Sequence, residues 1–214
     1  MTHLAADHLV VAYRRTSAPV LDGLTVNFRP GALTAVTGPS GSGKSTLLYV
    51  LGLLVRPTAG DVIWHGAPTR DLTDVQRSRV RARETGFVFQ DSLLDPTRSV
   101  LANVCDAGLF AGMDRRTQER LAQGLLERFG LDHRSAHRPG EISGGQAQRV
   151  ALCRALLTSP TVVLGDEPTG NLDAASARVV WQALRDHAAE GATVVVATHD
   201  ESLAATADER LVLK

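Results

Sequence analysis

The chain has 214 residues, a length that suits one α/β domain with room for a small subdomain. Hydrophobic residues make up 43% of it, which excludes a disordered chain, and 23 basic residues balance 23 acidic ones, which removes the electrostatic case for nucleic-acid binding as the main role. Residues 1–10 hold no apolar stretch of signal-peptide length, and the longest apolar run, 47–55, is far short of the ~20 residues that span a bilayer. We therefore expect a soluble, cytoplasmic protein that reaches a membrane only through a partner.

A buried strand is predicted over residues 32–37 and a helix over 46–51, with a glycine-rich loop between them. The loop fits the phosphate-loop pattern, and its members are Gly38, Pro39, Ser40, Gly41, Ser42, Gly43, Lys44, Ser45 and Thr46. Its glycines lack Cβ atoms, so backbone N–H groups can converge on phosphate oxygens, and the helix adds the positive end of its dipole. Lys44 would place a charge between the β- and γ-phosphates, Ser45 would ligate Mg²⁺, and Thr46 would support them.

A plain Gly/Ser-rich turn leading into a helix is the alternative for this loop. That alternative does not explain the lysine. The chain has 21 arginines and only two lysines, and Lys44 is the only one before the last residue. We therefore predict a nucleoside triphosphate site.

Helices are predicted over 115–130 and 144–159, and Ile142-Ser143-Gly144-Gly145-Gln146 lead into the second one. Ser143 and Gln146 also fit a capping box, which is a purely structural interpretation. The cap does not explain two adjacent glycines, which lower helix stability but let the backbone approach an anion. Because the first loop already serves this chain's own nucleotide, the second anion site suggests a nucleotide held by another copy.

Two further buried strands are predicted, over 161–165 and 193–198. The first ends in Asp166-Glu167 and the second in His199, at the carboxyl edge where open α/β sheets place ligands. Asp166 would hold Mg²⁺ and Glu167 would polarise the attacking water. The alternatives are a polar turn after the first strand and an ordinary polar histidine after the second.

In this order the motifs resemble those of the nucleotide-binding domain of ABC transporters, over essentially the whole chain. Residues 38–45 match the Walker A motif, 162–167 resemble Walker B with its catalytic glutamate, and 142–146 resemble the LSGGQ signature. Ile142 replaces the usual leucine and Gly165 the usual alanine, and both changes leave the polar chemistry intact.

Four more positions carry the resemblance. Gln90, after Gly86-Phe87-Val88-Phe89, matches the Q-loop glutamine, Asp173 in Asn171-Leu172-Asp173 looks like the D-loop aspartate, and His199 looks like the switch histidine. Tyr13 sits where the family keeps an aromatic residue for adenine stacking, although a tyrosine in a strand is more often part of a core.

The resemblance implies a P-loop NTPase of α/β class. We expect an ABC-type core with a mostly parallel central sheet, an antiparallel β region near the N-terminus and a helical subdomain. The chain would be a single ABC ATPase domain, 1–214, with a core lobe of residues 1–90 and 160–214 and a helical subdomain of 91–159. The hinges would be Gln90 and the residues just before Glu141.

The resemblance also implies a working unit of two chains that enclose two ATP molecules with Mg²⁺. Each ATP would lie between Lys44 of one chain and Ser143, Gly144, Gly145 and Gln146 of the other. The catalytic residues would be Glu167, His199, Lys44 and Gln90, the metal residues Ser45, Gln90 and Asp166, and Asp173 would connect the two sites.

Residues 166–173 are most similar to ATPases of lipoprotein-release, macrolide- and peptide-export and cell-division permease systems. We therefore expect an ATPase that drives a separate membrane permease, docked near residues 91–113, from the inner face of the cell membrane. Two alternatives stay open. One is an ATPase that regulates a membrane complex without transport. The other is a soluble relative acting on nucleic acid, which would need a long coiled-coil insertion or two fused domains.

Overall fold

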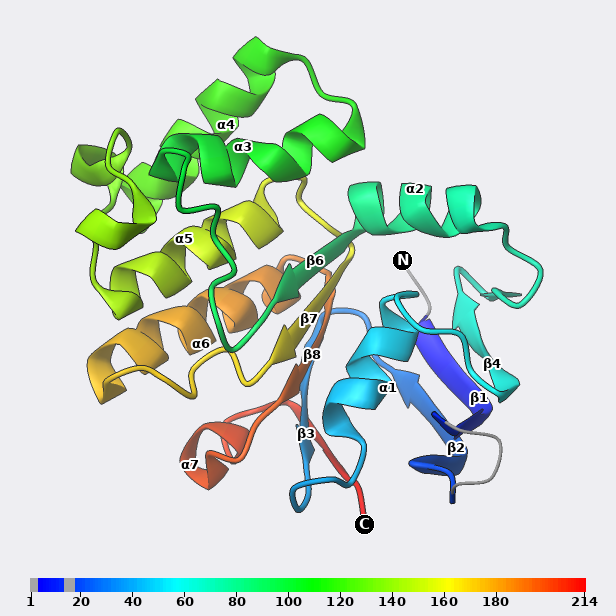
Figure 1. Ribbon diagram of the computed structural model, residues 1–214. Helices are drawn as coiled ribbons and strands as arrows, with labels where there is room; N and C mark the ends of the chain where they lie inside the picture. Colours follow the sequence, from blue (N-terminus) through cyan, green and yellow to red (C-terminus); the bar gives the residue numbers. More distant parts are fainter. Residues whose placement is uncertain (1–3, 14–17) are drawn as a thin grey trace.

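The computed structural model describes residues 4–13 and 18–214. Two sheets and a group of helices make up the molecule (Figure 1). The first sheet is antiparallel, with the strand order β2-β1-β4-β5, and consists of β1 (Leu4–Val11), β2 (Leu21–Phe28), β4 (Ala59–Trp64) and β5 (Ala67–Pro68). It lies near the N-terminus, as predicted.

The second sheet has five parallel strands in the order β6-β7-β8-β3-β9. They are β3 (Ala32–Thr37), β6 (Thr85–Val88), β7 (Val162–Asp166), β8 (Thr193–Ala197) and β9 (Glu209–Val212). Every residue of β3, β7 and β8 is buried, because helices cover both faces of the sheet. The predicted P-loop α/β fold class is confirmed.

The helices are α1 (Lys44–Leu51), α2 (Asp74–Glu84), α3 (Val100–Ala111), α4 (Arg115–Arg128), α5 (Gly144–Leu156), α6 (Ala174–Ala189) and α7 (Glu201–Ala204). Two short 3-10 turns, Asp132–Arg134 and Pro139–Glu141, lead from α4 to α5. The helices predicted over 115–130 and 144–159 are therefore present but end two and three residues earlier. Helix α2 lies within the predicted core lobe, while α3, α4 and α5 lie within residues 91–159.

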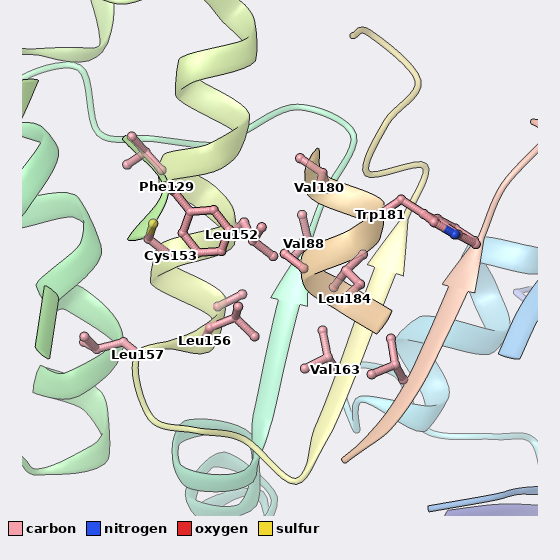
Figure 2. Packing of buried hydrophobic residues seen from close by; sticks show 14 of the residues in the cluster. Val88, Phe129, Leu152, Cys153, Leu156, Leu157, Val163, Val180, Trp181 and Leu184 are labelled. Carbon is pink, nitrogen blue, oxygen red and sulfur yellow. The ribbon is translucent and has the colours of Figure 1, made fainter. Parts of the chain in front are cut away.

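The hydrophobic core forms two clusters, one on each face of the parallel sheet. One joins α1 to the antiparallel sheet. The other joins α3, α4, α5 and α6 to the parallel strands, and Figure 2 shows Leu152 and Leu156 of α5 pointing toward Val88 and Val163 of the sheet. Helix α5 therefore packs on β6 and β7, the strands that lead to Gln90 and to Asp166. Within the described part of the chain, no helix combines the length and apolar character needed to cross a membrane.

Candidate nucleotide-binding and catalytic site

The predicted site residues gather at the carboxyl edge of the parallel sheet. Strands β7 and β8 are paired so that Asp166 lies opposite Ala197, and β3 and β8 so that Val36 lies opposite Ala197. Parallel strands in this register end together, so the loops that follow β3, β7 and β8 are neighbours. The phosphate loop, Asp166-Glu167 and His199 come from these three loops.

The phosphate loop owes its shape to three glycines with positive φ: Gly38 (146°), Gly41 (83°) and Gly43 (92°). A Cβ on Gly38 would lie 2.4 Å from the carbonyl oxygen of Leu213, and one on Gly43 would lie 2.8 Å from Leu21 Cδ2. No other residue fits at these two positions without moving its neighbours. Gly43 is also the N-cap of α1 and offers no side-chain cap, so the first N–H groups of that helix are available to an anion.

Lys44 lies across its own loop. Its Nζ donates hydrogen bonds to the carbonyl oxygens of Gly38 (2.9 Å) and Pro39 (3.0 Å). The hydroxyl of Ser42 is buried and has no hydrogen-bond partner among the described residues. A buried polar atom of this kind, next to free helix N–H groups, is typical of a loop that binds a phosphate.

Asp166 is held through both of its carboxylate oxygens. Ser45 Oγ donates to Oδ1 (2.8 Å), and the Tyr49 hydroxyl donates to Oδ2 (3.0 Å). Burial raises the pKa of Tyr49 to about 12, and the bond to Asp166 adds to the shift, so the phenol stays protonated as a donor. Sequence reasoning missed Tyr49. The signal was its place one helical turn after Ser45, on the same face of α1.

Ser45 and Asp166 fit a magnesium ion. Both offer hard oxygen atoms, and Mg²⁺ typically takes only one or two protein oxygens and keeps phosphate and water as its other ligands. No group of three or more His, Cys, Asp or Glu side chains that could form a denser metal site occurs in the described ranges. The donor set therefore suits Mg²⁺ brought with a nucleotide.

Glu167 and His199 form a pair that joins two neighbouring loops. Oε2 of Glu167 lies 2.6 Å from Nδ1 of His199 and 3.4 Å from its backbone nitrogen. Glu167 has a φ of 50°, which is uncommon for a residue with a side chain and is typical of functional sites. This backbone conformation directs the carboxylate toward the histidine.

Gln90 is exposed and lies beside the turn that follows Glu167. A Cβ on Gly170 would lie 3.4 Å from Gln90 Nε2, so the glycine leaves room for the amide. The side chain of Tyr13 is 62% exposed, and its hydroxyl lies 2.9 Å from Thr46 Oγ1 at the start of α1. The core interpretation of Tyr13 is therefore wrong, and its ring lies next to the phosphate loop.

The signature residues begin α5, and the capping box is present. Ser143 Oγ accepts from Gln146 N (3.3 Å), and Gln146 Oε1 accepts from Ser143 N (2.9 Å). A Cβ on Gly144 would meet no atom within 4 Å, so the fold itself does not require this glycine. In Figure 1 the start of α5 lies well away from the start of α1. One chain therefore does not bring its signature residues to its own phosphate loop.

Asp173 caps α6 next to the signature. Its Oδ1 accepts from Ala175 N (2.9 Å) and Ser176 N (3.0 Å), and these bonds hold the pKa of its carboxyl below the usual value. Ser176 in turn faces Gly145, where a Cβ would lie 2.7 Å from Ser176 Oγ. The D-loop and the signature thus form one exposed surface.

Comparisons of the sequence and of the structure with known proteins both identify ATP-binding proteins of the ABC type. The family model described as ABC transporter matches residues 21–170. The lipoprotein-releasing system ATP-binding protein LolD of Maricaulis maris is 46% identical over 194 residues, which is 90% of this chain and 85% of that protein. The LolD of Bordetella avium is 44% identical over 211 residues, which is 97% of this chain and 92% of that protein. The dimeric post-hydrolysis structure of the ATP-binding cassette MJ0796, bound to ADP and Pi, has a TM-score of 0.90 at 33% identity and covers 99% of this chain and 94% of that one.

Proposed function

This chain belongs to the ABC transporter family as an ATP-binding subunit that hydrolyses ATP, and we propose that two copies enclose two ATP molecules and drive a separate membrane permease. The observation that carries the proposal is the place of Gly144. It stands at an exposed helix start that the fold does not require to be glycine, away from the chain's own phosphate loop. A helix N-terminus with free N–H groups binds anions, and only a second chain can bring it a phosphate.

Within each site, different residues bind the phosphates, hold the metal ion and activate the attacking water. Lys44 and the N–H groups at the start of α1 hold the β- and γ-phosphates, while Ser45 and Asp166 hold Mg²⁺. Bound there, Mg²⁺ would neutralise charge on the phosphates. Glu167 orients and deprotonates the attacking water, and His199, held by Glu167, contacts the γ-phosphate.

The remaining residues complete the nucleotide site and connect it to the second chain and to the permease. Tyr13 stacks on the adenine, and Ser143, Gly144, Gly145 and Gln146 of the second chain close over the γ-phosphate. Gln90 contacts Mg²⁺ and transmits closure to the partner protein, and Asp173 connects the two sites. Because the γ-phosphate touches both chains, ATP favours the closed pair and its loss favours the open pair.

A groove between α2, the segment after β6 and α3 supports a docking site for the permease. It has a volume of about 1040 Å³, and its exposed apolar side chains include Phe110 (75% exposed) and Leu93 (60%). Arg79 and Arg83 line the α2 side, and neither has an acidic partner among the described residues. We propose that a cytoplasmic helix of the permease binds here, with apolar side chains on Phe110 and Leu93 and a carboxylate facing the arginines.

The relatives named LolD support an extrusion-type system of the lipoprotein-releasing kind, with this chain held at the inner face of the membrane by its permease. The alternative is an ATPase that moves a membrane partner without transport. Purification of the tagged chain from detergent-solubilised membranes, with identification of what accompanies it, tests the membrane role. A partner without transmembrane helices would contradict it. ATP-dependent release of a lipoprotein from vesicles containing the purified complex would separate transport from regulation.

A further inference from the structure

One buried glutamine joins three parts of the site. Gln148 lies in α5 and is 3% exposed. Its Nε2 donates to the carbonyl oxygen of Phe89 (2.7 Å) and to that of Pro168 (3.0 Å). Phe89 immediately precedes Gln90, and Pro168 immediately follows Glu167. A single amide group therefore ties α5 to the Q-loop and to the turn that carries the proposed water-activating carboxylate.

An arginine six residues further along α5 binds the other side of the Q-loop. Arg154 donates from Nη1 to the carbonyl oxygen of Leu93 (2.8 Å) and from Nη2 to that of Ser92 (2.9 Å). Both flanks of Gln90 and Asp91 are thus fastened to one helix, while these two residues are themselves exposed. The positions of the flanks decide where the Gln90 amide lies.

We propose that Gln148 and Arg154 are positioning residues that hold the Q-loop on α5, and that Gln148 also holds the Glu167 turn in register with Gln90. Buried N–H donors that meet two carbonyls at good distance are costly to lose, because the carbonyls stay buried without a partner. Any side chain of similar length would fill the space at position 148. Only a side chain with N–H donors would also satisfy the carbonyl oxygens of Phe89 and Pro168.

The same network reaches the docking groove, and this part rests on the proposed function. Phe89, Leu93 and Arg154 all line that groove. A partner that moves these residues would move the flanks of Gln90 and, through Gln148, the Glu167 turn.

The first experiment compares Gln148→Met, which keeps the length and removes the donors, with Gln148→Lys, which keeps N–H donors. Hydrogen exchange of the isolated chain should increase in Gln148→Met in two segments together, 85–93 and 165–172, and remain close to wild type in Gln148→Lys. The kcat for ATP should fall roughly 10- to 100-fold in Gln148→Met, because small misplacements of catalytic groups have effects of that size, while the Kd for ATP changes less than about twofold. Gln123→Met, at an exposed glutamine of α4, is the matched control.

Arg154→Met should loosen segment 85–93 and leave 165–172 unchanged, with Arg116→Met on the exposed face of α4 as its control. A folded Gln148→Met protein with wild-type exchange in both segments and wild-type kcat would overturn the proposal. Equal losses in Gln148→Met and Gln148→Lys would overturn the donor role. If Gln148→Met fails to fold, the Lys variant and the segment-specific effect of Arg154→Met decide. The exchange measurement needs neither a permease nor turnover, so its result is independent of the proposed transport function.

Discussion

Nδ1 of His199 lies 2.6 Å from Oε2 of Glu167, across the gap between the ends of β8 and β7. The carboxylate is mostly buried and the imidazole is mostly exposed, with side-chain exposures of 19% and 69%. Glu167 thus directs the ring, and Nε2 remains available to a phosphate oxygen. The two side chains meet because the adjacent parallel strands β7 and β8 end at the same level.

Replacing Glu167 by Gln should abolish turnover without loss of ATP binding. The amide keeps the shape and can still contact His199, but it cannot accept the proton of the attacking water, so kcat should fall about 10²- to 10⁴-fold. ATP should then hold the two chains together, which light scattering during gel filtration would detect. Glu127→Gln, at an exposed acid of α4, should behave as wild type. Normal hydrolysis by Glu167→Gln would remove the role given to this residue.

Replacing Tyr49 by Phe should weaken Mg²⁺ binding while the protein stays folded. The phenyl ring keeps its packing against Phe87, but Oδ2 of Asp166 loses its donor. Groups that orient a metal ligand typically contribute 10- to 100-fold in metal affinity. The Mg²⁺ concentration that gives half-maximal ATP hydrolysis should rise by such a factor, and nucleotide binding measured without Mg²⁺ should not change. An unaltered Mg²⁺ dependence would leave Tyr49 with a packing role alone.

Gly144→Val should abolish ATP hydrolysis without affecting folding. No atom lies within 4 Å of a Cβ at this position, so the chain should fold and bind ATP as before. The side chain would, however, cover the N–H groups that we expect to meet the second chain's γ-phosphate, and both dimer formation in ATP and turnover should be lost. Gly124→Val in α4 is the matched control, since a Cβ there also meets nothing within 4 Å. Full activity of Gly144→Val would contradict the shared site.

Tyr13→Ala should weaken ATP binding more than Tyr13→Phe. Stacking of a base on an aromatic ring contributes about 1–3 kcal/mol, so loss of the ring should raise the Kd roughly 5- to 150-fold. The Phe variant loses only the contact of the hydroxyl with Thr46 and should stay within a few-fold of wild type. Titration with a fluorescent ATP analogue measures both. Equal affinities for the Ala and Phe variants would show that the ring does not contact the base.

Acid should destabilise the protein through its helix caps. Asp114, Asp173 and Asp200 are N-caps, and the hydrogen bonds that their carboxylates accept lower the pKa of each below its value in the unfolded chain. A carboxyl with a lowered folded-state pKa contributes stability above its unfolded pKa and loses it as the pH falls through the folded value. Urea unfolding should therefore show a steady loss of stability below about pH 4. Asp114→Asn, which caps without a charge, should reduce this pH dependence, and an unchanged slope would contradict it.

The sequence alone determined the elements whose signals are local. The apolar run 32–37 is β3 as predicted, and the capping signals place the start of α5 at Gly144. The phosphate loop could be recognised because its glycines and Lys44 are close neighbours in the sequence. The antiparallel sheet was expected only from the family resemblance. Helix α2 was not foreseen, and Tyr13 could not be told from a core residue until its surroundings were known.

The partnerships were decided by the tertiary structure. Tyr49 reaches Asp166 across 117 positions of the chain, His199 reaches Glu167 across 32, and Gln148 reaches Phe89 across 59. Each depends on the strand order β6-β7-β8-β3 and on how α1 and α5 pack against it. This strand order buries both faces of the sheet at once. The free energy of that packing comes from contacts between segments far apart in the chain, so it cannot be read from any one segment of the sequence.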